Sequence, residues 1–406
     1  MNWIKPIVIT LFAVMIVLNG YQVYRIAFVR HEADFVACLA GAEDFRNGTN
    51  PYLPTAVAPY NTLENYRPYI YPLFFAWLWI PFTFLPPVAA SFAWYILSVA
   101  MMFYALALCA ELTGLTAQKE KWLIFGIIGI LFVSVFQWVL MFGHEDLFVL
   151  LLLLLSTKYL VKNESRSGWF LGAAISGKLM PIVVLPMLLK NWKAMALCLV
   201  SIVLFCVVIP YLFAGNAIFH FYDYWFHTTL TSEMSKGDES THSFALAGAV
   251  AQCLGLLRPT LFLKLACGLL LMSFPVMLLF KQKIVPAMFL SFMLIPLTST
   301  RSEPNHLTML VPAVMLLAAI VLKRKMIWRG KEIMLTTRQT IIGWTLLLAL
   351  QMMILWGYNA TVPFDTIGML IVFGLVFWSA WNESRRSGPQ RAMRTTPSAW
   401  AEGSDR

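Results

Sequence analysis

The chain has 406 residues, of which 60% are hydrophobic and only 12% are charged, and its formal net charge is +10. A soluble domain carries about 25% charged residues, so this composition excludes an ordinary soluble enzyme or binding module. Apolar runs near or above the roughly 20 residues that cross a bilayer recur along the whole chain. The sequence therefore predicts a polytopic membrane protein.

The first apolar run, Pro6–Phe28, is too long for the hydrophobic core of a signal peptide, and no A-x-A-like cleavage site follows it. We expect a retained membrane helix with Lys5 on the cytoplasmic side. Most of the six cysteines lie inside apolar runs, and none has a spacing typical of metal sites. They indicate neither a disulfide framework nor a metal centre.

The basic residues predict the orientation, because cytoplasmic loops of membrane proteins are enriched in Lys and Arg. The strongest cluster is KRKMIWRGKE, residues Lys323–Glu332, which we place inside, so that Ser299–His306 lies outside. The same rule places a second group of basic residues inside, namely Lys119, Lys121, Lys158, Lys162, Arg166, Lys190 and Lys193. The positive net charge is then an orientation signal and does not indicate nucleic-acid binding.

This orientation prevents two apolar stretches from being simple spans. Tyr71–Pro87, rich in Trp and Phe, becomes an interfacial helix at the outer surface. Gly168–Lys190 becomes a hairpin broken by Gly and Pro, which a bilayer tolerates only where the backbone is buried or lines a cavity. A rival topology makes both stretches full spans and places five of the basic residues outside.

Asp34 lies about one turn past the first helix, at the predicted outer interface. A loop Asp commonly does no more than stay solvated, but here a turn-rich stretch ending in NGTNPY and an aromatic stretch, ENYRPYIYPL, follow it. Together they predict a covered polar chamber next to lipid, with Tyr52, Arg67 and Tyr71 as candidate substrate-binding residues. Asp at membrane depth is costly unless it is solvated or paired.

A second acidic group, Glu145 and Asp146 in GHEDL, lies between two apolar runs on the same predicted face. It is either a helix N-terminal cap or part of the site. His144 beside it titrates near neutral pH or hydrogen-bonds the loop. All three are candidate substrate-binding residues.

Lys178, in AISGKLMP, lies deep in an apolar stretch, twelve residues from Arg166. A buried Lys needs a partner, unless its ammonium reaches an interface. Gly177 and Pro181 beside it are expected to unwind the helix and to expose backbone N–H groups. We interpret Lys178 as an anion ligand, most naturally for a phosphate.

Further polar residues stand at predicted outer helix ends. Arg301 and His306 in TSTRSEPNHLTMLVP are candidate phosphate ligands, and His242 in ESTHSFALAG is a weaker candidate for substrate binding. Each also fits an ordinary loop. No GxGxxG, P-loop, HExxH or paired-cysteine motif is present, so we expect no metal and no cofactor.

These groups suit transfer of a group from a lipid phosphate at a membrane surface. A carboxylate would take the proton of an acceptor hydroxyl, and Lys and Arg would stabilise the departing phosphate. A transporter or lipid-sugar flippase would also explain buried charge and broken helices, although no internal repeat is visible. A structural or assembly subunit is a further alternative.

Six motifs in chain order resemble glycosyltransferase family 87 of the GT-C superfamily. The run EADFVACLAGAEDFRNGTNPY is similar to its opening D-F-x-x-Y/C-x-x-A-x-x-x-x-x-G-x-N-P-Y. The others are YIYPLFFAWLWIPFTFLPP, GHEDLFVLLLLLLS, SGKLMPIVVLPMLL, THSFALAGAV and RSEPNHLTMLVPAVMLL. The chain departs from the family pattern where GHED replaces G-Q-x-N and THS replaces N-Q-S, which leaves the donor sugar and the acceptor open.

The resemblance implies an all-α polytopic helix bundle of the GT-C type, with about 10–13 membrane helices including interfacial and broken ones. It implies a glycosyltransferase, similar to alpha-1,2-mannosyltransferases, that moves mannose or another hexose or pentose from a polyprenyl-phosphate donor with inversion. The acceptor is a lipid or glycan hydroxyl on the outer face of the membrane. Asp34 falls on the family's general base, Lys178 on its Lys and His306 on its late His.

We expect one membrane domain over residues 1–383, with a first outer loop at 30–87. The basic residues 384–406 would form a disordered cytoplasmic tail. The expected partners are the lipid-linked donor, the acceptor and the bilayer, without nucleic acid. The expected location is a bacterial inner membrane, with the site on the periplasmic face.

Overall fold

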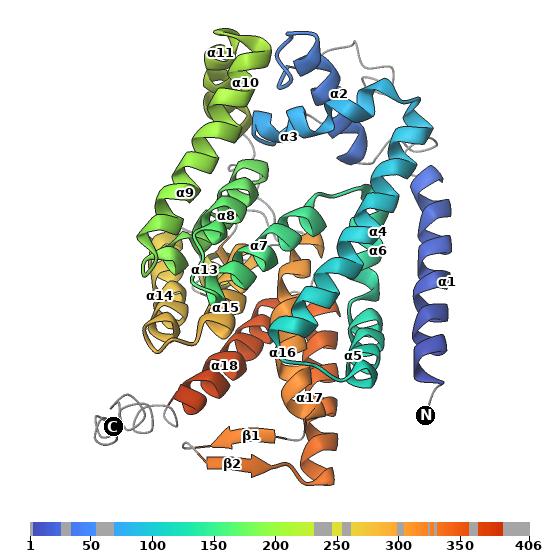
Figure 1. Ribbon diagram of the computed structural model, residues 1–406, viewed down its shortest axis with the longest axis vertical. Helices are drawn as coiled ribbons and strands as arrows, with labels where there is room; N and C mark the ends of the chain where they lie inside the picture. The colour runs from blue at the N-terminus through green and yellow to red at the C-terminus, as the bar shows by residue number, and fades with distance from the viewer. Residues whose placement is uncertain are drawn as a thin grey trace, which may run out of the picture.

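The protein is a bundle of helices with one small β-hairpin (Figure 1). A computed structural model describes residues 3–25, 34–53, 69–230, 246–253, 261–298, 304–323, 325–328, 331–356 and 364–384. The predicted all-α polytopic bundle is confirmed, because apolar helices make up nearly all of the described chain. The 385–406 part of the predicted tail lies outside the described residues.

The first half of the chain contains eight α-helices and two 3₁₀ segments in its described part. They are α1 (Ile4–Arg25), α2 (Asp34–Arg46), α3 (Leu73–Trp79), η3 (Ile80–Phe84), α4 (Pro87–Leu112), α5 (Gln118–Leu131), α6 (Val133–Phe142), α7 (Asp146–Val161), α8 (Arg166–Gly177) and η4 (Met180–Leu188).

The second half continues with α-helices, two π segments, a 3₁₀ segment and the hairpin. They are α9 (Trp192–Val203), η5 (Leu204–Val208), α10 (Ile209–Ala214), α11 (Ala217–Tyr224), η6 (Trp225–Leu230), α13 (Leu246–Cys253), α14 (Leu261–Phe280), α15 (Ile284–Thr298), η7 (Pro304–Leu310), α16 (Val311–Leu322), β1 (Lys325–Trp328), β2 (Lys331–Met334), α17 (Thr337–Trp356) and α18 (Phe364–Ser384). The two strands are antiparallel, with Lys325 opposite Met334.

Six helical stretches in the described part are long and apolar enough to cross a membrane. They are Ile4–Arg25, Pro87–Leu112, Trp192–Ala214, Phe262–Phe280, Pro304–Leu322 and Thr366–Ser384. Helices α5 and α6 make a seventh if their bent pair, with a 72° angle at the break, is one span. The chain is therefore a multi-pass membrane protein.

The stretch Tyr71–Pro87 forms α3 and η3, which together extend only about 20 Å. A span needs about 30 Å. Figure 1 shows α3 lying across the end of the bundle, at a steep angle to α4. This geometry agrees with the predicted interfacial helix and not with a full span.

The stretch Gly168–Lys190 is a broken hairpin, as predicted. Helix α8 ends at Gly177, the backbone is extended at Lys178, and η4 leads back. The two ends of the hairpin meet, because the Asn191 side-chain amide donates to Asn163 Oδ1 at 3.1 Å. The segment thus enters and leaves at the same level.

Basic side chains link several helices at one end of the bundle, which we call the basic end. Lys158 pairs with Glu111 at 3.0 Å, and Lys323 donates to the Gly114 carbonyl at 2.6 Å. Lys190 donates to the Leu279 carbonyl, and Lys283 pairs with Glu383. The hairpin β1–β2 lies at this end, whereas α2, α3 and α11 lie at the opposite end (Figure 1). The contacts support the predicted grouping of these basic residues on one side.

An aromatic cluster joins α2, α3 and α4 beneath the α2–α3 end. The rings of Trp79 and Trp94 pack at a tilt of 39° with 4.4 Å between their centroids, and Phe35 contacts Trp79 edge-on. All three side chains are buried. Because large buried rings lose little conformational freedom and bury much area, they hold Asp34 at the start of α2 against the bundle.

Candidate active site

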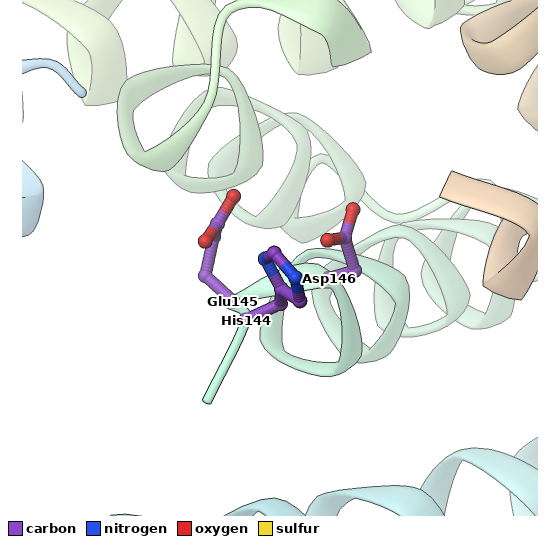
Figure 2. Close-up of side chains that lie close together, drawn as sticks. All are labelled: His144, Glu145 and Asp146. Carbon is purple, nitrogen blue, oxygen red and sulfur yellow. The ribbon is translucent and has the colours of Figure 1, made fainter. Parts of the chain in front are cut away.

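The site is centred on the turn GHED between α6 and α7. Gly143 ends α6 with a left-handed φ of 73°. A Cβ there would lie 2.8 Å from Phe35 Cβ, so glycine fits both the backbone angle and the close approach of α2. Trp94 Nε1 fixes the turn by donating to the Gly143 carbonyl at 3.0 Å. His144, Glu145 and Asp146 follow, all buried (Figure 2).

His144 faces Asp34, the first residue of α2. Nδ1 of His144 lies 2.9 Å from Asp34 Oδ2, with side-chain exposures of 4% and 20%. Burial alone would lower the pKa of His144, but Asp34, Asp146 and Glu145 outweigh it and hold the pKa above the ordinary 6.5. Sequence reasoning had both residues as candidates but did not predict that they meet.

Lys178 lies at the break between α8 and η4 and reaches the same turn. Its ammonium lies 2.6 Å from Glu145 Oε1 and 3.1 Å from Asp146 Oδ1, and 6.0 Å from the centre of the Tyr71 ring. Glu145 is the N-cap residue of α7 but makes no side-chain cap hydrogen bond, and Asp146 lies in the first turn of that helix. The predicted partner of the buried Lys is this pair of carboxylates.

Asn305 completes the shell around Asp146. Its side-chain amide donates to Asp146 Oδ2 at 2.6 Å, and His306 beside it interacts electrostatically with Asp146. Both residues are buried in η7. Sequence reasoning singled out His306 and missed Asn305, although its place next to His306 in the same polar segment was a usable signal.

Two tyrosines predicted to bind substrate lie in the wall beside Lys178. The Tyr52 hydroxyl donates to the Tyr71 carbonyl at 2.9 Å, and its ring stacks on Trp225. Tyr69 packs between them. Tyr52 therefore links the chain after α2 to η6, and the Tyr71 ring lies 6.0 Å from the Lys178 ammonium.

Arg67, His242 and Arg301, the remaining predicted site residues, lie outside the described residues. In the described part the site thus contains three carboxylates, the Lys178 ammonium and two histidines. One ligand atom each from His144, Glu145 and Asp146 lies within 4.8 Å of the others, a spacing at which one cation contacts all three. The Lys178 ammonium contacts two of these three residues, Glu145 and Asp146.

A buried set of acids, a Lys and histidines inside a multi-pass helix bundle defines a membrane protein with a polar reaction or transport site. The sequence model of glycosyltransferase family 87 matches residues 69–300, more than half of the chain. The chain belongs to this family and is a membrane glycosyltransferase. No curated protein and no solved structure gives a significant match.

The matched region contains the GHED turn and Lys178 but neither Asp34 nor His306. The family therefore assigns the class of reaction. The roles proposed for Asp34 and His306 rest on the geometry and on the opening and late motifs of the sequence.

Proposed function

We propose that the protein transfers a sugar from a polyprenyl-phosphate donor to a hydroxyl of a lipid or glycan acceptor, with inversion at the anomeric carbon. The observation that carries the proposal is the presence, in one polar site, of a partly exposed carboxylate, Asp34, and a buried ammonium, Lys178. The reaction would take place on the outer, periplasmic face of a bacterial inner membrane, since the basic end predicts the cytoplasmic side.

Asp34 is the proposed general base because it is the most accessible of the three acids, whereas Glu145 and Asp146 are 1% exposed. Its carboxylate takes the proton of the acceptor hydroxyl while the acceptor oxygen attacks the anomeric carbon. The bond from that carbon to the phosphate oxygen breaks, and its electron pair stays on the phosphate. Attack from the face opposite the leaving group inverts the configuration.

Lys178 is the proposed phosphate ligand. An ammonium has three N–H donors; one donates to Asp146 Oδ1, while Glu145 Oε1 lies at 2.6 Å as an ion pair. A remaining N–H is therefore proposed to reach the substrate. This N–H would bind a phosphate oxygen and stabilise the charge that grows on the leaving group. His306 and Arg301 are proposed to act with it.

Lipid access to this site is favoured by apolar side chains at the α2–α3 end. Phe84 and Leu85 after α3, and Leu212 and Phe213 in α10, are exposed. Phe213 also contacts Trp77 of α3. A prenyl chain or a lipid acceptor would pack along these side chains while its polar head reaches Asp34 and Lys178.

The test offers purified protein a panel of polyprenyl-phosphate sugars together with membrane lipid acceptors, and analyses the lipid products by mass spectrometry. Asp34→Asn should lower the transfer rate by about 10²–10⁴-fold while donor binding persists. Asp223→Asn, which changes an exposed acid far along α11, is the matched control. Flux of a lipid-linked sugar without any glycosylated product would instead support the transporter or flippase alternative.

A further inference from the structure

Asp34 has a basic side chain, His144, 2.9 Å from its carboxylate, and the proposed sugar transfer does not by itself require one there. A carboxylate serves as a base only while it is ionised, yet the His144 side chain that contacts Asp34 also lies beside two further acids, Glu145 and Asp146. Like charges and burial both favour the protonated form of an acid. A nearby positive charge or hydrogen-bond donor is therefore needed to keep the Asp34 carboxylate ionised.

The described ion pairs of the Lys178 ammonium are with Glu145 and Asp146. Among the described contacts, the basic group that touches Asp34 is His144, at 2.9 Å. His306 interacts with Asp146 from η7, and the other titratable neighbours, Tyr71 and Cys38, are neutral when protonated. His144 is thus a basic group in direct contact with Asp34.

The backbone fixes His144 for this role. Gly143 turns the chain in a left-handed conformation against Phe35, and Trp94 holds its carbonyl. The contact between Nδ1 and Asp34 is not aligned as a hydrogen bond in this structure, so it acts as an ion pair. Such contacts at active sites commonly tighten only when substrate is bound.

We propose that His144 is a positioning residue that keeps Asp34 ionised and oriented toward the acceptor hydroxyl. This inference rests on the proposed function, in which Asp34 is the base. The proton still passes from the acceptor to Asp34. The imidazolium orients the carboxylate and offsets the field of Glu145 and Asp146.

The first measurement needs no sugar donor. Dicyclohexylcarbodiimide reacts with protonated carboxyl groups, and peptide mass spectrometry quantifies its attachment to Asp34 across a pH series. In His144→Phe and His144→Gln the labelling curve should move upward by about one pH unit, because the favourable cation is gone. His227→Phe is the matched control, since His227 also lies 3.1 Å from an aspartate, Asp223, but both are exposed.

The second measurement uses whichever polyprenyl-phosphate sugar supports turnover. His144→Phe should lower kcat about 10- to 100-fold at pH 6.5, recover to within about threefold of wild type at pH 8.5, and leave KM for the donor unchanged. His144→Gln tests the same effect with a side chain that keeps polar contacts. A residue that only supports packing would lower the rate equally at every pH.

An unshifted labelling curve in both variants, or a loss of kcat that high pH does not restore, would overturn the role of His144. If the wild-type protein forms no product with any donor of the panel, the proposed function fails. In that case the labelling curve still decides whether His144 controls the ionisation of Asp34.

Discussion

Lys178 is an ammonium shared by two buried carboxylates, and removing it takes away the cation that contacts both directly. Lys178→Met should therefore lower the free energy of unfolding by about 3–5 kcal/mol, because breaking a buried ion pair from one side leaves uncompensated charge. Thermal unfolding in detergent measures this. The double variant Glu145→Gln/Lys178→Met should recover part of the loss.

Lys158 provides the matched control for this prediction. It makes the same kind of pair with Glu111 at 3.0 Å, but the two side chains are 26% and 56% exposed. Lys158→Met should cost no more than about 1 kcal/mol, the usual range for surface pairs. Equal losses of unfolding free energy in the two Lys variants would mean that the contacts of Lys178 contribute no more than those of an exposed ion pair.

The raised pKa of His144 predicts a pH dependence of stability. In the unfolded chain His144 has a pKa near 6.5, whereas its pKa in the folded protein is higher. As pH rises, the unfolded chain therefore releases this proton at a lower pH than the folded protein does. The stability from this proton is complete below about pH 6.5 and is lost as pH rises through the higher folded value. The unfolding temperature should therefore fall on the alkaline side of pH 6.5, and the fall should be smaller in His144→Gln. Equal slopes would contradict the prediction.

At the residue scale, the sequence identified polar groups in apolar surroundings. Burying such groups costs free energy unless they are paired or solvated, so they commonly mark functional sites. The sequence thus selected Asp34, Glu145, Lys178 and His306. It could not show that Lys178 contacts Glu145, or that Asn305 binds Asp146, because those partners are 33 and 159 positions apart and only packing brings them together. The assignment of Lys178 to phosphate alone therefore omitted its two carboxylate partners.

At the scale of elements, the hairpin depends on close packing of α8 against α9. A Cβ added at Gly168 would lie 1.7 Å from the Ala194 carbonyl oxygen and 2.9 Å from the Cys198 nitrogen. These are backbone atoms, so the helices must separate. Gly168→Ala should lower the yield of monodisperse protein and cost about 1–3 kcal/mol or more, as overpacking does.

The control for this element is Gly374 in α18, where an added Cβ meets nothing within 4 Å. Gly374→Ala should leave both the size-exclusion profile and the unfolding temperature close to those of the wild type. If Gly168→Ala behaved like this control, α8 and α9 would not pack as closely as the structure has them.

The sequence predicted which apolar stretches deviate from simple spans, and the reason lies in the charges beside them. If the basic residues all lie on one side, Tyr71–Pro87 and Gly168–Lys190 cannot each cross the membrane once. The structure has a short transverse helix and a hairpin at these two stretches. The 72° bend between α5 and α6 was not predicted. No Pro or charged residue lies at the bend. Phe132, the C-cap residue of α5, is fully buried there, so packing within the bundle accounts for the bend and the local sequence does not predict it.

At the scale of the whole molecule, the basic end and the active site lie in different parts of the bundle. Lys158, Lys190 and Lys323 contact backbone or acids of other helices at the basic end, whereas Asp34 begins a helix at the α2–α3 end (Figure 1). The positive-inside tendency then places Asp34 toward the outside. Charge patterning could predict this orientation because it acts on whole loops and needs no knowledge of packing.

Cysteine labelling tests this orientation in intact cells. In a variant without the six native cysteines, Asn47→Cys, after α2, and Lys162→Cys, after α7, each place one thiol at an exposed position. A membrane-impermeant maleimide should label position 47 from outside intact cells, and position 162 only in inside-out vesicles, because the Lys-rich end stays in the cytoplasm. Detergent-solubilised protein, in which both thiols should react, controls for reactivity. Labelling of position 162 from outside would show that the bundle has the opposite orientation. Asp34 would then lie on the cytoplasmic side, where the proposed periplasmic transfer could not occur.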